Sequence, residues 1–169
     1  MRDRVAQELT PQMRRMGVQD PPWFLGALLN STPVDIEGAR EFIRQHHWGV
    51  LVTRRANGGV QASPVVASVD GAGAVTISTR ETARKVHNLR RDPRVSYCGF
   101  TERFYGDWLQ IDGTAEVLSL PAALEPLVDY YRSIRGEHED WDRYRAAMTE
   151  ERRVLVRLTI ERVGPQRSG

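Results

Sequence analysis

The segment STRETARKVHNLRRDPRVS, residues 78–96, brings together side chains that can hold one particular anion. It contains Lys85, the only lysine of the chain, directly after Arg84. We expect a short helix over residues 81–91 with both cations in its first turn, where the positive end of the helix makes cations unfavourable. An anion, most simply a phosphate, relieves this repulsion and also satisfies free backbone N–H groups. Asn88 lies one turn further along and can hydrogen-bond a polar edge of the same ligand.

This expected helix has one face that should pack against the rest of the protein. Its apolar residues recur every three positions, at Ala83, Val86 and Leu89. Thr79 and Thr82 are the two candidate N-caps, because a threonine hydroxyl can accept a hydrogen bond from a free N–H group of the first turn. These signals predict a helix that begins close to the two cations.

Two other interpretations of the same segment stay open. A basic run is often only a solvated surface, and we expect Arg90, Arg91 and Arg94 to face water. A nucleic-acid patch is less favoured, because no aromatic residues interleave with the arginines and the formal net charge is only +2. Spacing by itself therefore leaves three alternatives: an anion site, a solvated helix and a nucleic-acid patch.

No other part of the sequence suggests catalysis by protein side chains. It contains no GxGxxG, P-loop or GxSxG motif, and no Cys/His pair has metal-binding spacing. Cys98 is the only cysteine, which excludes an internal disulfide framework and a cysteine zinc site. Since nothing pairs a nucleophile with a base, we expect a cofactor to carry the chemistry if the protein is an enzyme.

The elements that must position these residues are mostly strands. Segments rich in Val, Ile, Thr and aromatic residues, separated by turn sequences such as ANGG and DGAG, predict strands at 48–55, 60–69, 74–80, 94–100, 107–118 and 152–163. Besides the helix at 81–91, helical patterns follow Asp35 and occupy LPAALEPLVDYYRSIRG and DWDRYRAAMTEE. Six strands with helices at the corners, and no βαβ rhythm, predict an antiparallel barrel.

Length and composition favour one globular domain. The chain has 169 residues, of which 40% are hydrophobic and 27% charged. We expect residues 34–169 to form the domain and residues 1–33 to be an N-terminal appendage of helix and loop. The apolar stretch at 23–29 is too short to span a membrane and too far from the start for a signal peptide. A cytoplasmic location is therefore expected.

Taken in order, the motifs resemble those of a known family. SPVVASVDGAGAVTISTRETARKVHNLRRDPRVSYC followed by WLQIDGTAEV resembles the pyridoxamine-5′-phosphate-oxidase-like superfamily of split β-barrel flavin and deazaflavin oxidoreductases. NLRRDPRVS after a strand ending in IST, with GEHEDWDRYRAAM before the terminal RVLVRLTIERV, is similar to its actinobacterial branch that uses the deazaflavin coenzyme F420. The resemblance runs from about residue 36 to 163. It implies a mainly β, FMN-binding-like split barrel with helices (α+β), and a homodimer with two cofactor sites at the subunit interface.

The resemblance also implies which residues contact the cofactor. Arg84 and Lys85 would hold its phosphate, the end of the third strand would contact it by backbone and hydroxyl, and residues 63–65 would lie along its ring. Trp108 and Gln110 match a strand that the other subunit contributes to the site. The cofactor-binding residues implied in this way are Ser63, Pro64, Val65, Ser78, Thr79, Arg84, Lys85, Asn88, Trp108 and Gln110.

The activity implied is hydride transfer from reduced F420 to a small electron-poor organic acceptor of the enone, quinone or tetrapyrrole type. FMN is the alternative cofactor, because both carry a tricyclic ring and a ribityl phosphate. A broad basic groove that includes Arg54, Arg55 or Arg80 would favour the longer F420. A non-catalytic module that binds a cofactor or an anion is the second alternative. No catalytic side chain, metal, nucleic acid or membrane is expected, and substrate specificity is expected in loops such as FTERFYGDW.

Overall fold

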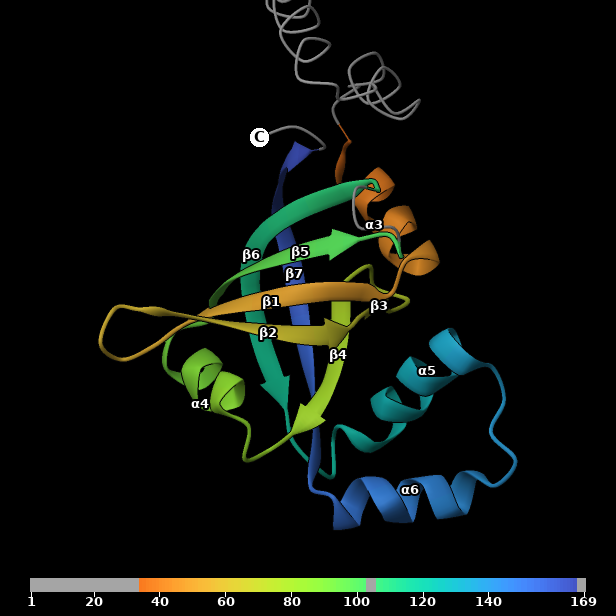
Figure 1. The fold of residues 1–169 in the computed structure, drawn as a ribbon. Helices are drawn as coiled ribbons and strands as arrows, with labels where there is room; N and C mark the ends of the chain where they lie inside the picture. The colour runs from red at the N-terminus through yellow and green to blue at the C-terminus, as the bar shows by residue number, and fades with distance from the viewer. Residues whose placement is uncertain (1–33, 103–105, 167–169) are drawn as a thin grey trace, which may run out of the picture. The chain divides into compact units, whose positions relative to one another are not determined.

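The computed structural model describes residues 34–102 and 106–166 (Figure 1). The expected N-terminal appendage, residues 1–33, lies outside the described residues, as does part of the loop FTERFYGDW. Within the described part of the chain, no helix combines the length and the apolar character needed to cross a membrane.

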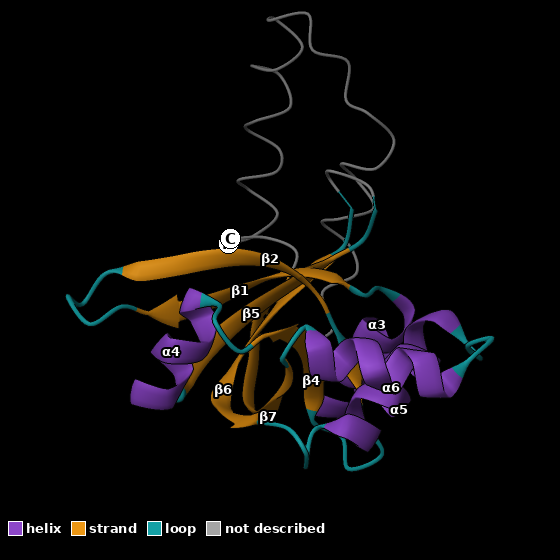
Figure 2. Ribbon diagram, turned by 90° about the horizontal axis from the view of Figure 1, so that it is seen from below, coloured by secondary structure: helices purple, strands orange, loops and turns teal. Residues whose placement is uncertain are grey.

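The described elements are mainly antiparallel strands. The strands are β1 (Trp48–Arg54), β2 (Val60–Val66), β3 (Ser68–Val69), β4 (Val75–Arg80), β5 (Arg94–Phe100), β6 (Trp108–Leu118) and β7 (Arg153–Gln166). The helices are α3 (Ile36–Gln45), α4 (Arg84–Arg91), α5 (Leu124–Arg135) and α6 (Trp141–Glu150). The strands form one sheet in the order β2-β1-β5-β6-β7-β4-β3, which curls into a half-barrel (Figures 1 and 2). The predicted split β-barrel with helices is confirmed.

The predicted strand at 60–69 divides into two, and this division lets the sheet curl. β2 pairs with β1, whereas β3 pairs with β4, so one segment of the chain supplies both edges of the sheet. Ala67, between them, is fully buried, and its N–H donates to the carbonyl oxygen of His47 at 2.7 Å. The alternation of residue types predicted a strand here but not this change of partner, because the partner is decided by tertiary pairing.

The interior of the barrel is apolar, as the period-2 patterns predict. Burial alternates along β1 and β5, whose inward residues include Leu51 and Tyr97, both fully buried. Helix α3 covers part of this core with Ala39 and Ile43, also fully buried. Asp35 caps α3 as predicted, because its side chain accepts a 2.8 Å hydrogen bond from the N–H of Gly38. Burying a side chain such as Leu51 contributes roughly 1.5–3 kcal/mol.

A second apolar cluster joins α5 and α6 to the start of β7. It includes Leu127, Val128, Tyr144 and Met148, packed around Leu155. The hydroxyl of Tyr144 donates to the carbonyl oxygen of Leu127 at 3.0 Å, so this buried polar group is satisfied. The two helices predicted between the fifth and sixth strand segments therefore form a small separate core beside the barrel.

Candidate cofactor site

Helix α4 begins later than the sequence predicts, and its N-cap is different. The N-cap is Ala83, which makes no side-chain capping hydrogen bond, so the prediction of Thr79 or Thr82 is wrong. Thr79 lies within β4 and its hydroxyl accepts from Lys85 instead. The first turn of α4 contains no acidic residue. The start of the helix therefore has neither a capping side chain nor a carboxylate to balance the cations there.

The two predicted phosphate ligands occupy different environments at this helix start. Arg84 is exposed, and Lys85 is half-buried with its Nζ 3.3 Å from the hydroxyl oxygen of Thr79. Burial lowers the pKa of Lys85, because removing water disfavours the charged ammonium. Within residues 34–102 and 106–166, neither cation forms an ion pair with a carboxylate. A bound anion would supply the missing negative charge.

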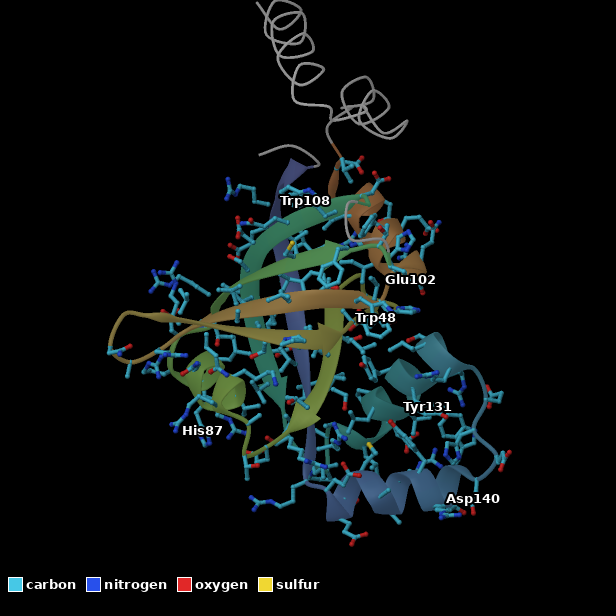
Figure 3. All side chains as sticks on the ribbon, viewed as in Figure 1. Trp48, His87, Glu102, Trp108, Tyr131 and Asp140 are labelled. Atoms are coloured by element: carbon cyan, nitrogen blue, oxygen red, sulfur yellow. The ribbon has the colours of Figure 1, made fainter. Side chains whose placement is uncertain are left out.

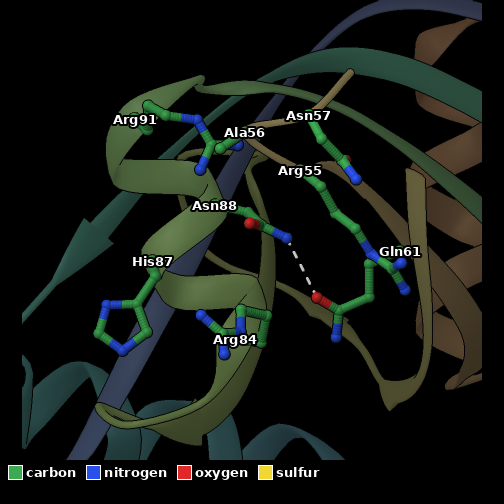
Figure 4. A pocket seen from close by; sticks show the side chains of 8 residues that line it. All are labelled: Arg55, Ala56, Asn57, Gln61, Arg84, His87, Asn88 and Arg91. Atoms are coloured by element: carbon green, nitrogen blue, oxygen red, sulfur yellow. Dashed lines mark hydrogen bonds between the residues drawn. The ribbon is translucent and has the colours of Figure 1, made fainter. Parts of the chain in front are cut away.

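A pocket of about 470 Å³ lies between α4 and the turn that joins β1 to β2 (Figure 4). Its lining contains three arginines and no carboxylate. The lining residues are Arg55, Ala56, Asn57, Gln61, Arg84, His87, Asn88 and Arg91. With the histidine neutral, the lining carries only positive formal charge, which favours an anionic ligand.

The inner wall of this pocket is a network of uncharged polar side chains. Asn88 is only 2% exposed, and its Nδ2 donates to the hydroxyl oxygen of Thr53 and to Oε1 of Gln61, both at 3.0 Å. Gln61 in turn donates from Nε2 to the hydroxyl of Ser63 at 3.4 Å. The network ties α4 to β1 and β2, which hold the two walls of the pocket together.

The structure brings several of the predicted cofactor ligands to this pocket. Arg84 and Asn88 line it directly. Lys85, in the first turn of the same helix, donates to Thr79 of β4, and Ser63 is reached through Gln61. Asn88 and Ser63 are thus linked through Gln61, and contacts of all these residues with a cofactor stay a prediction.

Three other predicted residues lie on β2 or β4 and do not line the pocket. Ser78 is half-buried on β4, opposite Leu155 of β7. Pro64 is exposed on the outer face of β2, whereas the adjacent Val65 packs partly against the barrel core. Because neighbouring strand residues point to opposite faces, Pro64 points away from the face that Ser63 and Val65 share.

Trp108 and Gln110 do not line this pocket in the same chain. They lie at the start of β6, opposite Phe100 and Cys98 of β5, and Figure 3 shows Trp108 well apart from His87. Gln110 donates from Nε2 to Asp112 Oδ1 at 3.0 Å. A role for these two residues in a site therefore requires a second subunit, as the family resemblance implies, and stays a prediction.

Sequence reasoning missed several pocket residues, and helical spacing could have found two of them. His87 and Arg91 follow Arg84 by three and seven residues, so they share its face of α4. Arg91 was expected only to face water. Gln61 and Asn57 carried no signal, because only the β1–β2 pairing brings this hairpin beside α4.

The curled antiparallel sheet and its cationic pocket define a protein of the split β-barrel class. Residues 36–167 match the family model of pyridoxamine 5′-phosphate oxidase, and the chain belongs to this family. Proteins of this family bind flavin-type cofactors.

Solved structures share the fold. A conserved hypothetical protein from Mycobacterium tuberculosis is 25% identical with a TM-score of 0.63, over 75% of this chain and 81% of the other. An F420 reductase is 16% identical with a TM-score of 0.57, over 74% of this chain and 94% of the other. A heme-binding protein from Mycobacterium smegmatis is 20% identical with a TM-score of 0.59, over 81% of this chain and 58% of the other. At these identities the last two likenesses show the fold only.

Proposed function

We propose that the protein is an F420-dependent oxidoreductase whose pocket beside α4 binds the phosphate-bearing part of the coenzyme. The observation that carries this proposal is the charge of the pocket. Arg55, Arg84 and Arg91 line it without any carboxylate, and the half-buried Lys85 lies in the same helix. An anion is the ligand that this arrangement favours, since each guanidinium can donate two parallel hydrogen bonds to phosphate oxygens.

The chemistry is assigned to the cofactor. Among the described residues, no group of three or more His, Cys, Asp or Glu side chains could hold a metal ion. When bound, the reduced deazaflavin supplies a hydride for an electron-poor acceptor of the enone, quinone or tetrapyrrole type. The protein's own residues then bind the anionic part of the coenzyme, orient it and exclude water from the ring.

The number of cations favours F420 over FMN. A phosphate monoester carries about two negative charges, whereas the lining contains three arginines, Arg55, Arg84 and Arg91. The longer, acidic tail of F420 can use this additional charge. Arg80 does not line the pocket, and it forms an ion pair with Glu151 at 3.5 Å. FMN remains the alternative cofactor, since its phosphate fits the same residues.

We also propose that the working form is a homodimer. The outer face of β1 and β2 exposes large apolar side chains: Trp48 is 57%, Val60 60% and Val66 39% exposed. Trp48 and Val66 are direct partners in the β1–β2 pairing, so they form one continuous patch. A second copy on this face would cover the patch, and its Trp108 and Gln110 would complete the cofactor site.

Titration of the full chain with F420, FMN and duplex DNA at two salt concentrations tests the proposal. Tight F420 binding, followed by oxidation of reduced F420 in the presence of a quinone or enone, is the expected result. Tight binding without turnover for any acceptor would favour a cofactor-binding module. Tight DNA binding with steep salt dependence and no cofactor affinity would exclude the oxidoreductase.

A further inference from the structure

A second cavity lies between α5, the β3–β4 hairpin and β7, and its lining shares no residue with that of the pocket beside α4. Helix α5 packs beside β3 and β4 there (Figure 1). The cavity has a volume of about 300 Å³, which is at the lower end of the range for small-molecule sites. Its apolar walls are formed by Val69, Leu118, Pro126 and Leu155. It can therefore take a small molecule with an apolar body.

The hydroxyl of Thr76 is a buried polar group in this cavity. Thr76 lies on β4, is 2% exposed and belongs to the lining. In the strand pairing it stands between Ser68 of β3 and Arg157 of β7. Within residues 34–102 and 106–166, no hydrogen bond joins its hydroxyl to another group. Since buried hydroxyls nearly always have a partner, this one is open to a ligand.

Two other hydroxyls of the lining have already committed their hydrogens. Tyr130 donates to the carbonyl oxygen of Val66 at 2.9 Å, and Ser133 donates to the carbonyl oxygen of Tyr130 at 2.7 Å. A carbonyl oxygen can only accept and a hydroxyl has one hydrogen, so both hydroxyls can only accept from a ligand. Burial raises the pKa of Tyr130 to about 12, so its hydroxyl keeps this hydrogen at neutral pH.

The charged side chains of the lining carry a net negative charge. They are Asp70, Asp129 and Arg157, which are two carboxylates and one guanidinium. Arg157 is held by Asp70 at 2.8 Å and also by Glu116, outside the lining, at 2.9 Å, so two carboxylates offset its charge. Asp129 is exposed and pairs with Arg132 at 3.1 Å. This charge favours a cation, whereas the arginines of the pocket beside α4 favour an anion.

We propose that this cavity is a second binding site, which takes a small organic cation made of a primary ammonium group and an apolar body. The ammonium donates three hydrogen bonds and accepts none, which matches a lining rich in carboxylate and hydroxyl oxygens. The hydroxyl of Thr76 accepts one of these hydrogens, and the apolar body lies against the leucine, valine and proline walls. The inference is independent of the proposed function, because the two pockets share no lining residue and favour opposite charges.

Three probes of similar size and different charge test the proposal: benzylamine, benzyl alcohol and benzoate. Each is titrated into the full chain, and binding is followed by the NMR shifts of backbone amides. Benzylamine is expected to shift amides of α5 and of the β3–β4 turn. It should bind at least about tenfold more tightly than benzyl alcohol, the effect of one hydrogen bond to a charged group. Benzoate should not bind at this cavity, because the carboxylates repel it.

Two substitutions connect this binding to the lining. Thr76→Val keeps the β-branched shape and removes the hydroxyl, and Asp129→Asn removes one negative charge. Each is expected to weaken benzylamine binding about threefold to tenfold. Asp142→Asn is the matched control and should stay within about twofold of wild type. Asp142 is also exposed and also pairs with an arginine three residues further on, but it lies outside the lining.

Several results would overturn the proposal. Equal binding of benzylamine and benzyl alcohol would do so, as would shifts confined to amides away from this cavity. Equal losses in Asp129→Asn and Asp142→Asn would show only a general charge effect. The unfolding midpoint shows whether Thr76→Val still folds, and Asp129→Asn, at an exposed position, carries the test if it does not. Titration of the same variants with F420 and FMN should match wild type, so a failure of the proposed function is detected separately.

Discussion

Lys85 and Thr79 contact each other across the turn between β4 and α4, with the Nζ of Lys85 donating to the hydroxyl oxygen of Thr79 at 3.3 Å. The ammonium is half-buried and has a hydroxyl as its partner, not a carboxylate. A neutral partner satisfies one hydrogen of the ammonium but does not offset its charge. Binding of an anion at this site should therefore be favourable, because the anion would offset the charge of the ammonium.

Removal of either cation should weaken cofactor binding. Arg84→Ala and Lys85→Ala are each expected to raise the dissociation constant of F420 or FMN at least about tenfold, since hydrogen bonds to charged groups contribute about 1.5–3 kcal/mol. Fluorescence titration measures the effect. Arg143→Ala is a suitable control, because Arg143 is exposed on α6 and lies outside the pocket lining. Equal and negligible effects at all three positions would mean that the start of α4 is only a solvated surface.

The lowered pKa of Lys85 should appear in the pH dependence of stability. Burial lowers this pKa from its usual 10.5, so between the two values the unfolded chain binds more protons than the folded protein. Stability should therefore rise with pH through the folded-state pKa and stop rising near 10.5. Urea unfolding of wild type and Lys85→Met from neutral to alkaline pH measures this contribution. Parallel curves for the two proteins would contradict it.

The patch on the outer face of β2 can be tested by charge. Val66→Asp should dissociate the proposed homodimer, because a carboxylate would be buried without a partner at the interface. Light scattering after size exclusion should report a dimer for wild type and a monomer for the variant. Cofactor binding should weaken as well, because Trp108 and Gln110 of the other subunit are lost from the site. Thr159→Asp, at an exposed position of β7, is the control that should stay dimeric.

Gly49 should tolerate no side chain. It is buried in β1, and a Cβ atom added there would collide with the ring of Tyr97, whose hydroxyl donates to the carbonyl oxygen of Trp48 at 3.2 Å. Gly49→Ala is therefore expected to destabilise the fold by about 1–3 kcal/mol, the usual cost of overpacking a core. Chemical denaturation measures this, with Gly71→Ala as control because a Cβ at Gly71 meets no atom within 4 Å.

Local patterns were sufficient for most of the secondary structure. The strands at 94–100 and 107–118 were predicted from alternation and match β5 and β6 closely, because a strand with one face in the core needs apolar residues at every second position. The start of α4 was predicted less well. Thr79 has the residue type of an N-cap, but pairing with β7 keeps it within β4 and moves the helix start to Arg84.

By itself, the sequence determined the strand and helix periodicity, the family, and the cations Arg84 and Lys85 on a short helix, because these depend on neighbours within a few residues. Only the tertiary structure decided what surrounds those cations. The β1–β2 hairpin brings Arg55 and Gln61 against α4, and the segment 60–69 changes partner at Ala67. Such contacts join residues far apart in the chain, so no local spacing encodes them, and the pocket exists only because the β1–β2 hairpin lies beside α4.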